Sequence, residues 1–330
     1  MTDDRTFLVT GALGFIGAWT VRALVGEGTP VVALDLATDR RRLRLVMADE
    51  ELARVTFATA DITDLAAVEA VLDEHRVTDV IHLAALQVPF CRADPPLGAR
   101  VNVLGTVNVF EAVKRRSDRI GRIVYTSSIG MFDAADADPQ SHRLAADATA
   151  HPTNHYGVYK QANEGTARVY WLEDGLSSVG IRPLTVYGPG RDQGLTSTPT
   201  KAILAAVLGR PYTISFGGRT SFQYAEDVAD TLVLAARSRI DGAPVYNLRG
   251  NVAHMAEFVA TIEAAVPEAA GTITFAERGL PFPEEIEAAG IAALGSVPVR
   301  PLEDGVRATV EIFRRHLETG VLVPEEALGA

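Results

Sequence analysis

The sequence has a single cysteine, Cys91, among its 330 residues, so no disulfide can form within the chain. One cysteine is also too few for a structural zinc knuckle, and we expect no bound metal. Apolar residues make up 47% of the chain. No uninterrupted apolar run reaches the roughly 18 residues that a membrane-spanning helix needs. These absences exclude a disulfide-stapled fold and argue against an integral membrane protein.

Positive charge is also scarce, since 31 basic residues stand against 42 acidic ones and the formal net charge is −11. Nucleic-acid binders usually carry the opposite sign or a basic stripe. The basic clusters at residues 40–44 and 114–116 are typical of solvated helix ends. The first five residues lack the basic lead and apolar core of a secretory signal. We therefore expect no nucleic-acid or membrane partner and a cytoplasmic location.

The first half of the chain alternates short β-branched runs with segments of helical length. Nearly continuous apolar strands between helices are typical of a parallel sheet that is covered on both faces. The fold class we predict is therefore α/β, with a Rossmann-type doubly wound parallel sheet. The predicted strands cover residues 7–10, 31–34, 55–58, 79–83 and 122–126, and the predicted helices cover 15–27, 64–75 and 96–116.

After about residue 127 the rhythm changes. A polar loop (127–150) leads into a helix predicted to start near Pro152, a good first-turn residue, and a sixth strand covers 178–182. Loops rich in glycine and proline follow, mixed with short helices and strands. We predict a dinucleotide-binding domain over residues 1–185. A smaller C-terminal α+β lobe over 186–330, mainly substrate-binding, would close over the carboxyl edge of the sheet.

A glycine loop joins the first strand to the first helix, with Gly11, Gly14 and Gly17 in the spacing G-x-x-G-x-x-G. Glycines there permit a tight turn and let the backbone approach a pyrophosphate, which is then stabilised by the positive end of the helix dipole. A plain strand–helix turn would also use glycine. The spacing differs from the commoner G-x-G-x-x-G fingerprint, so the loop needs support from its surroundings.

Two aspartates supply that support. Asp35 ends the second strand, 18 residues after Gly17, where an acid can bind the adenosine ribose hydroxyls. A carboxylate there repels a 2′-phosphate, so NAD is favoured over NADP, although Arg40 to Arg42 lie close in sequence. Asp61 follows the third strand, where it could accept a hydrogen bond from adenine or act as a helix cap.

Tyr156 and Lys160 stand four residues apart in the helix near Pro152, so their side chains share one helix face. A neighbouring ammonium favours the phenolate, and we expect Lys160 to lower the pKa of Tyr156. With eight tyrosines and three lysines in the chain, chance predicts only roughly 0.07 Tyr-x-x-x-Lys pairs. The pair therefore indicates acid–base chemistry beside a dinucleotide. Tyr159 points elsewhere on the helix, and we expect it to pack.

At this point the chain resembles the extended short-chain dehydrogenase/reductases, the NAD-dependent epimerase/dehydratase group. The resemblance covers nearly the whole chain and is specific for fold and cofactor, but much less so for substrate. The matching segments are the glycine loop, Asp35, Asp61, residues 82–85, 102–106 and 126–128, the Tyr156–Lys160 pair, residues 182–190 and 226–228.

The resemblance implies a role for each of these residues. Tyr156 would exchange a proton with a substrate hydroxyl, and Lys160 would depress the pKa of Tyr156 and bind the nicotinamide ribose. Ser128, chosen over Ser127 because the four residues after it fit the family pattern better, would hydrogen-bond the reacting oxygen. His82 is expected to be structural. The expected NAD contacts are Gly11, Gly14, Phe15, Ile16, Gly17, Asp35, Asp61, Ile62, Leu83, Ala84, Ala85, Asn102, Tyr156, Lys160 and Pro183.

The chain departs from the family pattern at three places. The acidic pair that follows the catalytic serine or threonine in the dehydratases is Ile129-Gly130 here, so elimination chemistry is not expected. Thr185 stands where many nucleotide-sugar enzymes have asparagine. Arg219 comes one residue early for their diphosphate clamp, and on a strand that shift turns a side chain to the opposite face. These departures weaken the interpretation as a nucleotide-sugar enzyme.

The expected substrate contacts are Gln87, Ser128, Tyr156, Arg191 and Thr196. Arg191 could bind a carboxylate or a sugar hydroxyl, or it could form a loop salt bridge with Asp192.

The leading hypothesis is an NAD-dependent enzyme that oxidises or reduces a secondary alcohol of a small sugar or sugar acid through a keto species. Release of the ketone would make it a dehydrogenase, and reduction from the other face an epimerase. A nucleotide-sugar 4-epimerase is the alternative, and a non-catalytic NAD(H)-sensing protein is a further one. The helices at 96–116 and 152–172 resemble those that pair in family dimers, so we predict a homodimer.

Overall fold

The computed structural model describes residues 5–288 and 290–328 of the chain. The acidic start, on which the expectation of no secretory leader rests, lies almost wholly outside these residues. Within the described residues, no helix combines the length and the apolar character that crossing a membrane requires.

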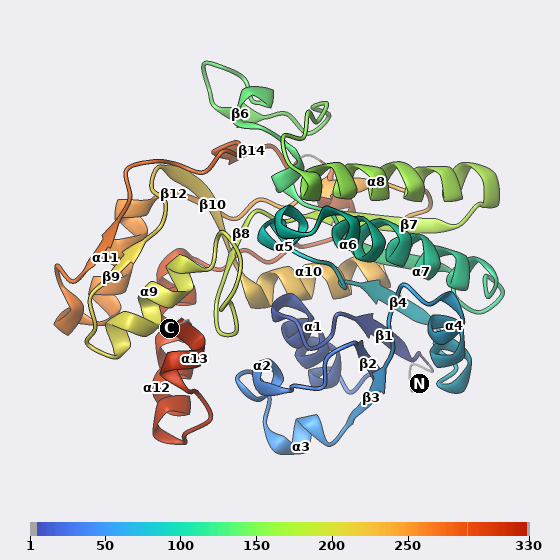
Figure 1. Cartoon of the computed structure of the whole chain (residues 1–330), viewed down its shortest axis with the longest axis horizontal. Helices are drawn as coiled ribbons and strands as arrows, with labels where there is room; N and C mark the ends of the chain where they lie inside the picture. The colour runs from blue at the N-terminus through green and yellow to red at the C-terminus, as the bar shows by residue number, and fades with distance from the viewer. Residues whose placement is uncertain (1–4, 289, 329–330) are drawn as a thin grey trace.

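A seven-stranded, entirely parallel sheet forms the centre of the larger part of the molecule (Figure 1). All six strands predicted for this part of the chain are present, which confirms the α/β fold class. The strand order reverses between β1 and β4, and ligands of open α/β sheets bind outside the carboxyl ends of the strands at such a point. The order across the sheet is β11 (Val245–Asn247), β7 (Ser177–Arg182), β5 (Arg122–Thr126), β4 (Asp79–His82), β1 (Phe7–Thr10), β2 (Val31–Asp35) and β3 (Val55–Thr59).

Helices cover both faces of this sheet. In β1, Phe7 and Val9 face one hydrophobic cluster and Leu8 faces another, and all three side chains are fully buried. This alternation explains the continuous apolar run of β1, because both faces of that strand are covered. The first cluster includes α1 (Phe15–Gly26) and α10 (Ala225–Arg237), and the second includes α4 (Leu65–Glu74), α7 (Gly105–Lys114) and α8 (His155–Asp174).

Two predicted helices differ from the structure at their bounds. The helix expected from Pro152 starts at His155, because Asn154 is its N-cap and accepts a hydrogen bond from Gly157 N at 2.9 Å. The single helix expected over 96–116 consists of three consecutive pieces, which are α6 (Pro95–Ala99), the π-helical turn η1 (Arg100–Leu104) and α7. Short helices α2 (Arg41–Arg44), α3 (Asp49–Leu52) and α5 (Val88–Ala93) complete this part of the chain.

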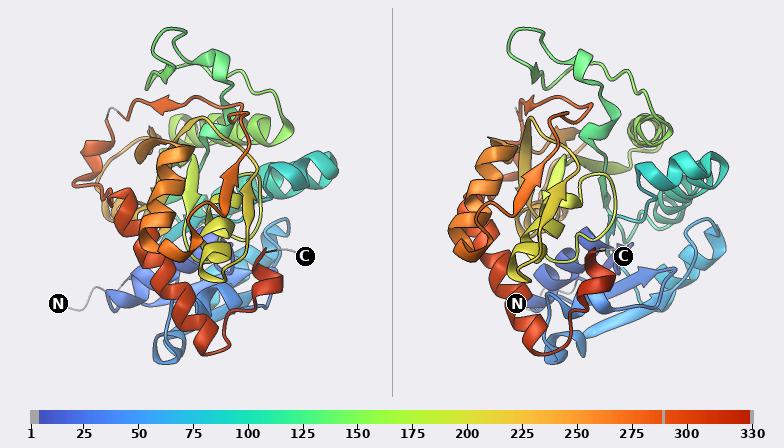
Figure 2. Two further views of the ribbon diagram at one scale, coloured as in Figure 1. Left: turned by 90° about the vertical axis from the view of Figure 1, so that its left-hand side faces the viewer. Right: turned by 60° about the vertical axis from the view of Figure 1, so that its left-hand side comes forward.

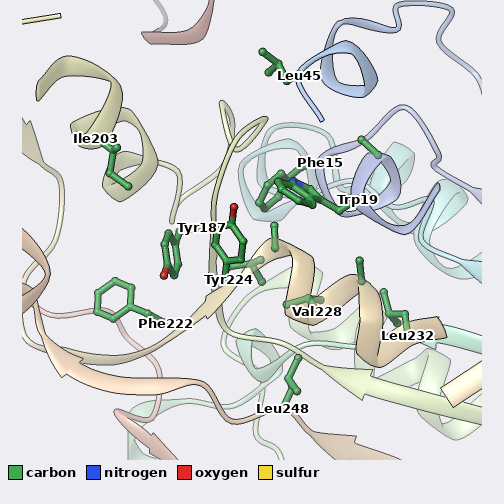
Figure 3. Packing of buried hydrophobic residues seen from close by; sticks show 14 of the residues in the cluster. Phe15, Trp19, Leu45, Tyr187, Ile203, Phe222, Tyr224, Val228, Leu232 and Leu248 are labelled. Atoms are coloured by element: carbon green, nitrogen blue, oxygen red, sulfur yellow. The ribbon is translucent and has the colours of Figure 1, made fainter. Parts of the chain in front are cut away.

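A smaller lobe packs against α1. Its aromatic core meets α1 at Trp19, whose ring lies 5.6 Å from that of Tyr224, which in turn lies 5.5 Å from Tyr187 (Figure 3). Trp19 also donates to the carbonyl of Pro189 at 3.0 Å. The elements of the lobe are the sheets β12 (Asn251–His254)–β10 (Arg219–Tyr224)–β8 (Thr185–Tyr187) and β13 (Ile273–Phe275)–β9 (Tyr212–Ile214), with α9 (Thr198–Val207), α11 (Met255–Ala265), η4 (Pro267–Ala269), η5 (Ile291–Leu294), α12 (Leu302–Glu318) and α13 (Pro324–Leu328).

The chain crosses between the two parts more than once. After β8 and β10 of the lobe it returns as α10, which packs on α1, and as β11, which pairs with β7 at the edge of the large sheet. The predicted division at residues 185 and 186 therefore does not separate the large sheet from the rest, because one of its strands comes from the second segment.

An excursion between β5 and α8 projects from the body of the molecule (Figures 1 and 2). Leu144 of the excursion and Ile286, which comes from a strand late in the chain, are buried with Ile129, Met131 and Phe132. The excursion therefore packs directly on the segment that follows Ser128. Its elements are η2 (Ile129–Met131), η3 (Ala134–Asp136) and β6 (Arg143–Leu144), which pairs with β14 (Glu285–Ile286).

Candidate active site

Two adjoining cavities lie at the carboxyl ends of β1, β2, β4 and β5. The larger, of about 570 Å³, is lined by the glycine loop and by Asp35 and Asp61. The second, of about 200 Å³, is lined by Ser128, Tyr156 and Lys160. The cavities share Gly11, Gly14, Phe15, Leu83, Ala85, Leu86, Gln87 and Arg191, so together they form one elongated site.

The glycine loop closes tightly against the neighbouring strand end. Gly11 has a φ of 66°, and a Cβ there would lie 2.7 Å from the backbone nitrogen of Ala84. A Cβ on Gly17 would collide with the carbonyl oxygen of Gly11. Gly14 is the N-cap of α1 and provides no side-chain cap, so the helix presents bare backbone at its positive end. Together with Phe15 and Ile16 this loop forms a cradle suited to a pyrophosphate.

Asp35 is held by the glycine loop itself. Its carboxylate accepts hydrogen bonds from Leu13 N at 2.9 Å and from Ala37 N at 3.0 Å, and it lines the larger cavity. This is where a carboxylate can bind ribose hydroxyls.

The arginines that follow Asp35 in the sequence are all engaged by other groups. Arg40 lies over the ring of Phe57 at 3.5 Å, and Arg42 donates to Asp192 at 2.8 Å. Arg41 pairs with Asp39 and Glu326.

Asp61 and Ile62 also line the larger cavity. The N-cap of α4 is Asp64, whose carboxylate accepts from Ala66 N and Ala67 N. Asp61 instead accepts from Thr63 N at 2.8 Å within its own turn. Of the two roles considered for Asp61, the capping role therefore belongs to Asp64.

The turn after β4 is held by hydrogen bonds with two buried side chains, Thr10 and Asn102. Leu83 N and Ala84 N each donate to the hydroxyl of Thr10 at 3.2 Å. Asn102 is fully buried, accepts from Leu86 N at 2.7 Å and donates to Leu86 O at 2.9 Å. Leu83, Ala84 and Ala85 line the larger cavity, whereas Asn102 contacts the backbone that carries them.

The adjacent serines point in different directions. Ser128 lines the second cavity, accepts from Gly130 N at 2.9 Å and hydrogen-bonds Tyr156. Ser127 is 1% exposed and donates to the carboxylate of Glu164 behind the site. The choice of Ser128 as the serine that faces the cavity agrees with this geometry.

Tyr156 and Lys160 lie together, with the ammonium nitrogen 5.7 Å from the centre of the phenol ring. Burial raises the pKa of Tyr156, while its hydrogen bond with Ser128 and the charge of Arg191 act to lower it. The structure thus differs from the expectation that Lys160 lowers this pKa. The reason is that burial of the phenol outweighs the groups that favour its charge. Lys160 is itself 4% exposed and donates to the Thr126 carbonyl at 2.6 Å. Burial lowers the pKa of Lys160 to about 8.

The three remaining candidate substrate contacts converge on one wall of the second cavity. Arg191 donates to Thr196 Oγ1 at 2.9 Å and to Gln87 Oε1 at 3.4 Å. Its Nε is buried and has no hydrogen-bond partner in the described part of the chain. The salt bridge considered for Arg191 is absent from the described residues, because Asp192 pairs with Arg42 instead. Burial lowers the pKa of Arg191 to about 10.

The second cavity also includes residues that sequence reasoning missed. Phe282, Leu184 and Leu195 line the same cavity as Arg191. Phe282 lies in a loop rich in glycine and proline about 120 residues after Tyr156, and no local pattern marks it. Pro183, which was expected at the cofactor, lines this cavity as well.

Other residues considered in the sequence have structural partners. His82 is buried between the hydroxyls of Thr10 at 2.7 Å and Thr106 at 3.1 Å. Tyr159 donates to the carbonyl of Pro95 at 2.8 Å. Arg219 is exposed at the start of β10, outside the residues that line the two cavities.

Comparison with known proteins identifies the family. Residues 7–248 match the NAD dependent epimerase/dehydratase family. The chain belongs to that family. The expected resemblance to the extended short-chain dehydrogenase/reductases is thereby confirmed, and the protein is an NAD-dependent enzyme of this type.

Several members of the family are similar along nearly their whole length. A UDP-glucose 4-epimerase of Mycolicibacterium smegmatis is 32% identical, with 93% of this chain and 98% of that protein covered. A UDP-glucose 4-epimerase of Azospirillum brasilense is 29% identical, with 97% and 96% covered. The Thermus thermophilus UDP-glucose 4-epimerase, solved in complex with NAD, has a TM-score of 0.79 and 29% identity, with 94% of this chain and 99% of that chain covered.

The fold also matches that of a protein named for a different reaction. A partial consensus L-threonine 3-dehydrogenase has a TM-score of 0.83 at 22% identity, with 94% of this chain and 99% of that chain covered. At that identity the likeness concerns the fold alone. The same fold thus occurs in epimerases and in a protein named as a dehydrogenase, and the substrate has to be argued from the site.

Proposed function

We propose that this enzyme uses NAD to oxidise a secondary alcohol of a small, hydroxyl-rich substrate to a ketone, and can run the step in reverse. One observation carries the proposal, namely that Ser128, Tyr156 and Lys160 face a single cavity next to the glycine loop. A proton acceptor, a hydroxyl partner and a cation at one point are what removal of a hydroxyl proton requires.

The cofactor would be held by the residues that line the elongated site. The glycine loop suits the pyrophosphate, Asp35 the adenosine ribose, and Lys160 the nicotinamide ribose. When bound, NAD supplies the acceptor for the hydride that leaves the alcohol carbon. Asp35 favours the unphosphorylated ribose because a carboxylate repels a 2′-phosphate.

Tyr156 would take the hydroxyl proton, and Ser128 would hydrogen-bond the reacting oxygen. Burial disfavours the phenolate, whereas Ser128 and Arg191 favour it, so these two neighbours lower the cost of forming the base. In the reducing direction Tyr156 returns the proton to the carbonyl oxygen. Release of the ketone gives a dehydrogenase, and reduction of the opposite face gives an epimerase.

The substrate class is argued from Arg191 and its neighbours in the second cavity. Arg191 is the one arginine among the lining residues of the second cavity in the described part of the chain, and it is flanked there by Gln87 and Thr196. A guanidinium with an unused buried N–H favours a carboxylate, which accepts charge-assisted hydrogen bonds. We therefore favour a sugar acid over a neutral sugar.

A nucleotide-sugar 4-epimerase is the second candidate, and it is favoured by the relatives that are UDP-glucose 4-epimerases. Its diphosphate would need cationic partners. Arg219 is exposed outside the cavities, and Arg300 pairs with Glu226 at 2.6 Å. Calorimetric titration with UDP and dTDP discriminates the two, because the sugar-acid enzyme should give no heat at millimolar nucleotide.

The main test follows NADH absorbance with a panel of aldoses, aldonic acids and uronic acids. We expect turnover that falls about 10²–10⁴-fold in Tyr156→Phe, while NAD binding persists. Arg191→Gln should raise KM about tenfold or more for acids and much less for neutral sugars. A chain that binds NAD, converts no member of the panel to ketone or epimer, and functions equally well as Tyr156→Phe would instead be an NAD(H)-sensing protein.

We also propose that residues 1–185 mainly bind the cofactor and carry the catalytic groups, and that residues 186–330 mainly bind the substrate. The first segment contributes the glycine loop and the Ser–Tyr–Lys group, and the second contributes Arg191, Thr196 and Phe282 to the cavity wall. We also propose that the enzyme acts in the cytoplasm, which fractionation of the cells that produce it would test.

A homodimer is supported by exposed apolar side chains on α8. Val158, Val169 and Leu172 are 45%, 46% and 66% exposed. By contrast, Val109 and Val113 of α7 are buried against the chain's own sheet. Light scattering should give twice the chain mass for the wild type and the chain mass for Leu172→Glu. A monomeric wild type would contradict the proposal.

A further inference from the structure

A buried acidic residue lies one helical turn beyond the catalytic lysine. Tyr156, Lys160 and Glu164 follow one another at intervals of four residues in α8, so their side chains lie along one helix face. The side chain of Glu164 is only 12% exposed. A carboxylate so deeply placed needs partners, and it has three hydrogen bonds.

Two of these hydrogen bonds come from Arg182, at the end of β7. Its Nε donates to Glu164 Oε1 at 2.7 Å and its Nη2 donates to Oε2 at 2.5 Å, which makes the pair bidentate. Arg182 is held in turn by Asn247 Oδ1 at 3.1 Å and lies over the ring of Phe132. The pair therefore ties α8 to the edge of the large sheet.

The third hydrogen bond comes from Ser127, whose hydroxyl donates to Glu164. Ser127 stands between two groups of the site: the carbonyl of Thr126, which accepts from Lys160, and Ser128, which hydrogen-bonds Tyr156. The backbone of Ser127 is also held to β7, through its N–H to the carbonyl of Ile181 at 2.7 Å.

We propose that Glu164 and Arg182 are positioning residues for the reaction, a role that rests on the function proposed above. Their ion pair fixes α8 against the ends of β5 and β7. It thereby fixes Tyr156 and Lys160 relative to Ser128 and the Thr126 carbonyl, and the Glu164 carboxylate helps to keep Lys160 protonated.

The charges around Lys160 support the second part of this role. Burial lowers its pKa, whereas Glu164 and the Cys91 thiol of α5 act to raise it. The other titratable neighbours are Tyr156 on the same helix and His82 of β4. Loss of the Glu164 carboxylate removes an opposing charge and leaves the Arg182 guanidinium without its counter-ion, so both effects favour neutral lysine.

The test compares the wild type with Glu164→Gln, which keeps the shape and an acceptor for Ser127. We expect kcat to fall about tenfold or more with KM little changed, because the reacting groups lose their alignment. The falling alkaline limb of kcat/KM for ketone reduction should move to lower pH by about one unit. Asp174→Asn is the control, since it removes a surface partner of Lys114 from the same helix and should leave both readouts unchanged.

A second readout needs no turnover. The chain has only three lysines, Lys114, Lys160 and Lys201, so NMR of isotope-labelled lysine gives three resonances, of which Lys160→Arg removes one. The Lys160 titration midpoint should fall in Glu164→Gln, with Lys114 and Lys201 unmoved. This result holds whether or not the proposed substrates are turned over, so it separates failure of the positioning role from failure of the proposed function.

An unchanged Lys160 midpoint together with unchanged kcat in folded, NAD-binding Glu164→Gln would overturn the proposal. Should that variant not fold, Ser127→Ala removes only the third hydrogen bond. It should lower kcat without raising KM, and an unaltered kcat in that variant would overturn the proposal equally.

Discussion

Asp192 pairs with Arg42 and not with Arg191, its neighbour in the chain. The Arg42 Nη2 lies 2.8 Å from Asp192 Oδ1, and both side chains are less than a fifth exposed. Arg42 also donates to the carbonyl of Leu13 in the glycine loop at 3.3 Å. One arginine thus joins the cofactor side of the site to the loop that carries Arg191, and it leaves the Arg191 guanidinium directed at Thr196 and Gln87.

Asp192→Asn should therefore destabilise the fold. The change leaves Arg42 and Arg191 close together without a counter-charge. We expect the free energy of unfolding in urea to fall by about 1–2 kcal/mol, between the values for exposed and buried pairs. Asp39→Asn breaks the exposed pair with Arg41 and should cost almost nothing. An equal decrease in the free energy of unfolding in the two variants would show that the pair of Arg42 and Asp192 stabilises the fold no more than the exposed pair does.

Ketone reduction should lose efficiency as pH rises through about 8. Burial lowers the pKa of Lys160 to about 8, so the ammonium is present below that pH and is lost above it. Tyr156, whose pKa is raised by burial, still carries its proton there. The measurement is the pH profile of kcat/KM with NADH, which reports the free enzyme. A profile that stays flat to pH 10 would contradict the assignment of this group.

Gly17→Ala should abolish NAD binding, because a methyl group there collides with the Gly11 carbonyl and lies 2.8 Å from Ala12 Cα. Overpacking of this kind costs about 1–3 kcal/mol of stability and shifts the backbone. Gly26→Ala in the same helix meets no atom within 4 Å and serves as the matched control. Calorimetric titration with NAD should show binding in the control alone. Undiminished affinity in Gly17→Ala would mean that the loop does not cradle the cofactor.

The buried His82 makes the fold sensitive to acid. Burial, aided by the charge of Lys160, lowers its pKa from 6.5 to about 3. Between these values the unfolded chain binds a proton that the folded chain does not, so the free energy of unfolding decreases as pH falls. His82→Gln lacks this contribution. Urea unfolding should show a smaller stability difference between wild type and variant at pH 5 than at pH 7, and a constant difference would argue against it.

The alternation of elements could be predicted because strands such as β1 and β2 carry apolar runs that are buried on both faces. β11 was missed because Val245–Asn247 is three residues long and pairs with β7 from a distant part of the chain. The start of α8 was placed too early, since proline at 152 suits a first turn, but the cap that satisfies the backbone is Asn154.

The parts of the candidate site that depend on local sequence spacing could be predicted. The interval between Tyr156 and Lys160 is a helix property, and the glycines mark a close backbone approach. The partner that Lys160 takes, the carbonyl of Thr126, depends on tertiary packing. For the same reason the buried phenol has a raised pKa, although an ammonium on the same helix face suggested the opposite. Phe282 reaches the cavity through a loop without periodicity, so only the folded chain reveals it.

The placement of β11 has a consequence for dissecting this protein. A fragment that stops at residue 185 would uncover the hydrogen-bonding groups along β7 and the apolar surface of α1 and of the sheet on which α10 rests. Unpaired strand edges and large exposed apolar surfaces promote association between copies of a chain. We therefore expect the amino-terminal fragment to aggregate when it is expressed alone. The cofactor-binding unit folds only as part of the whole chain.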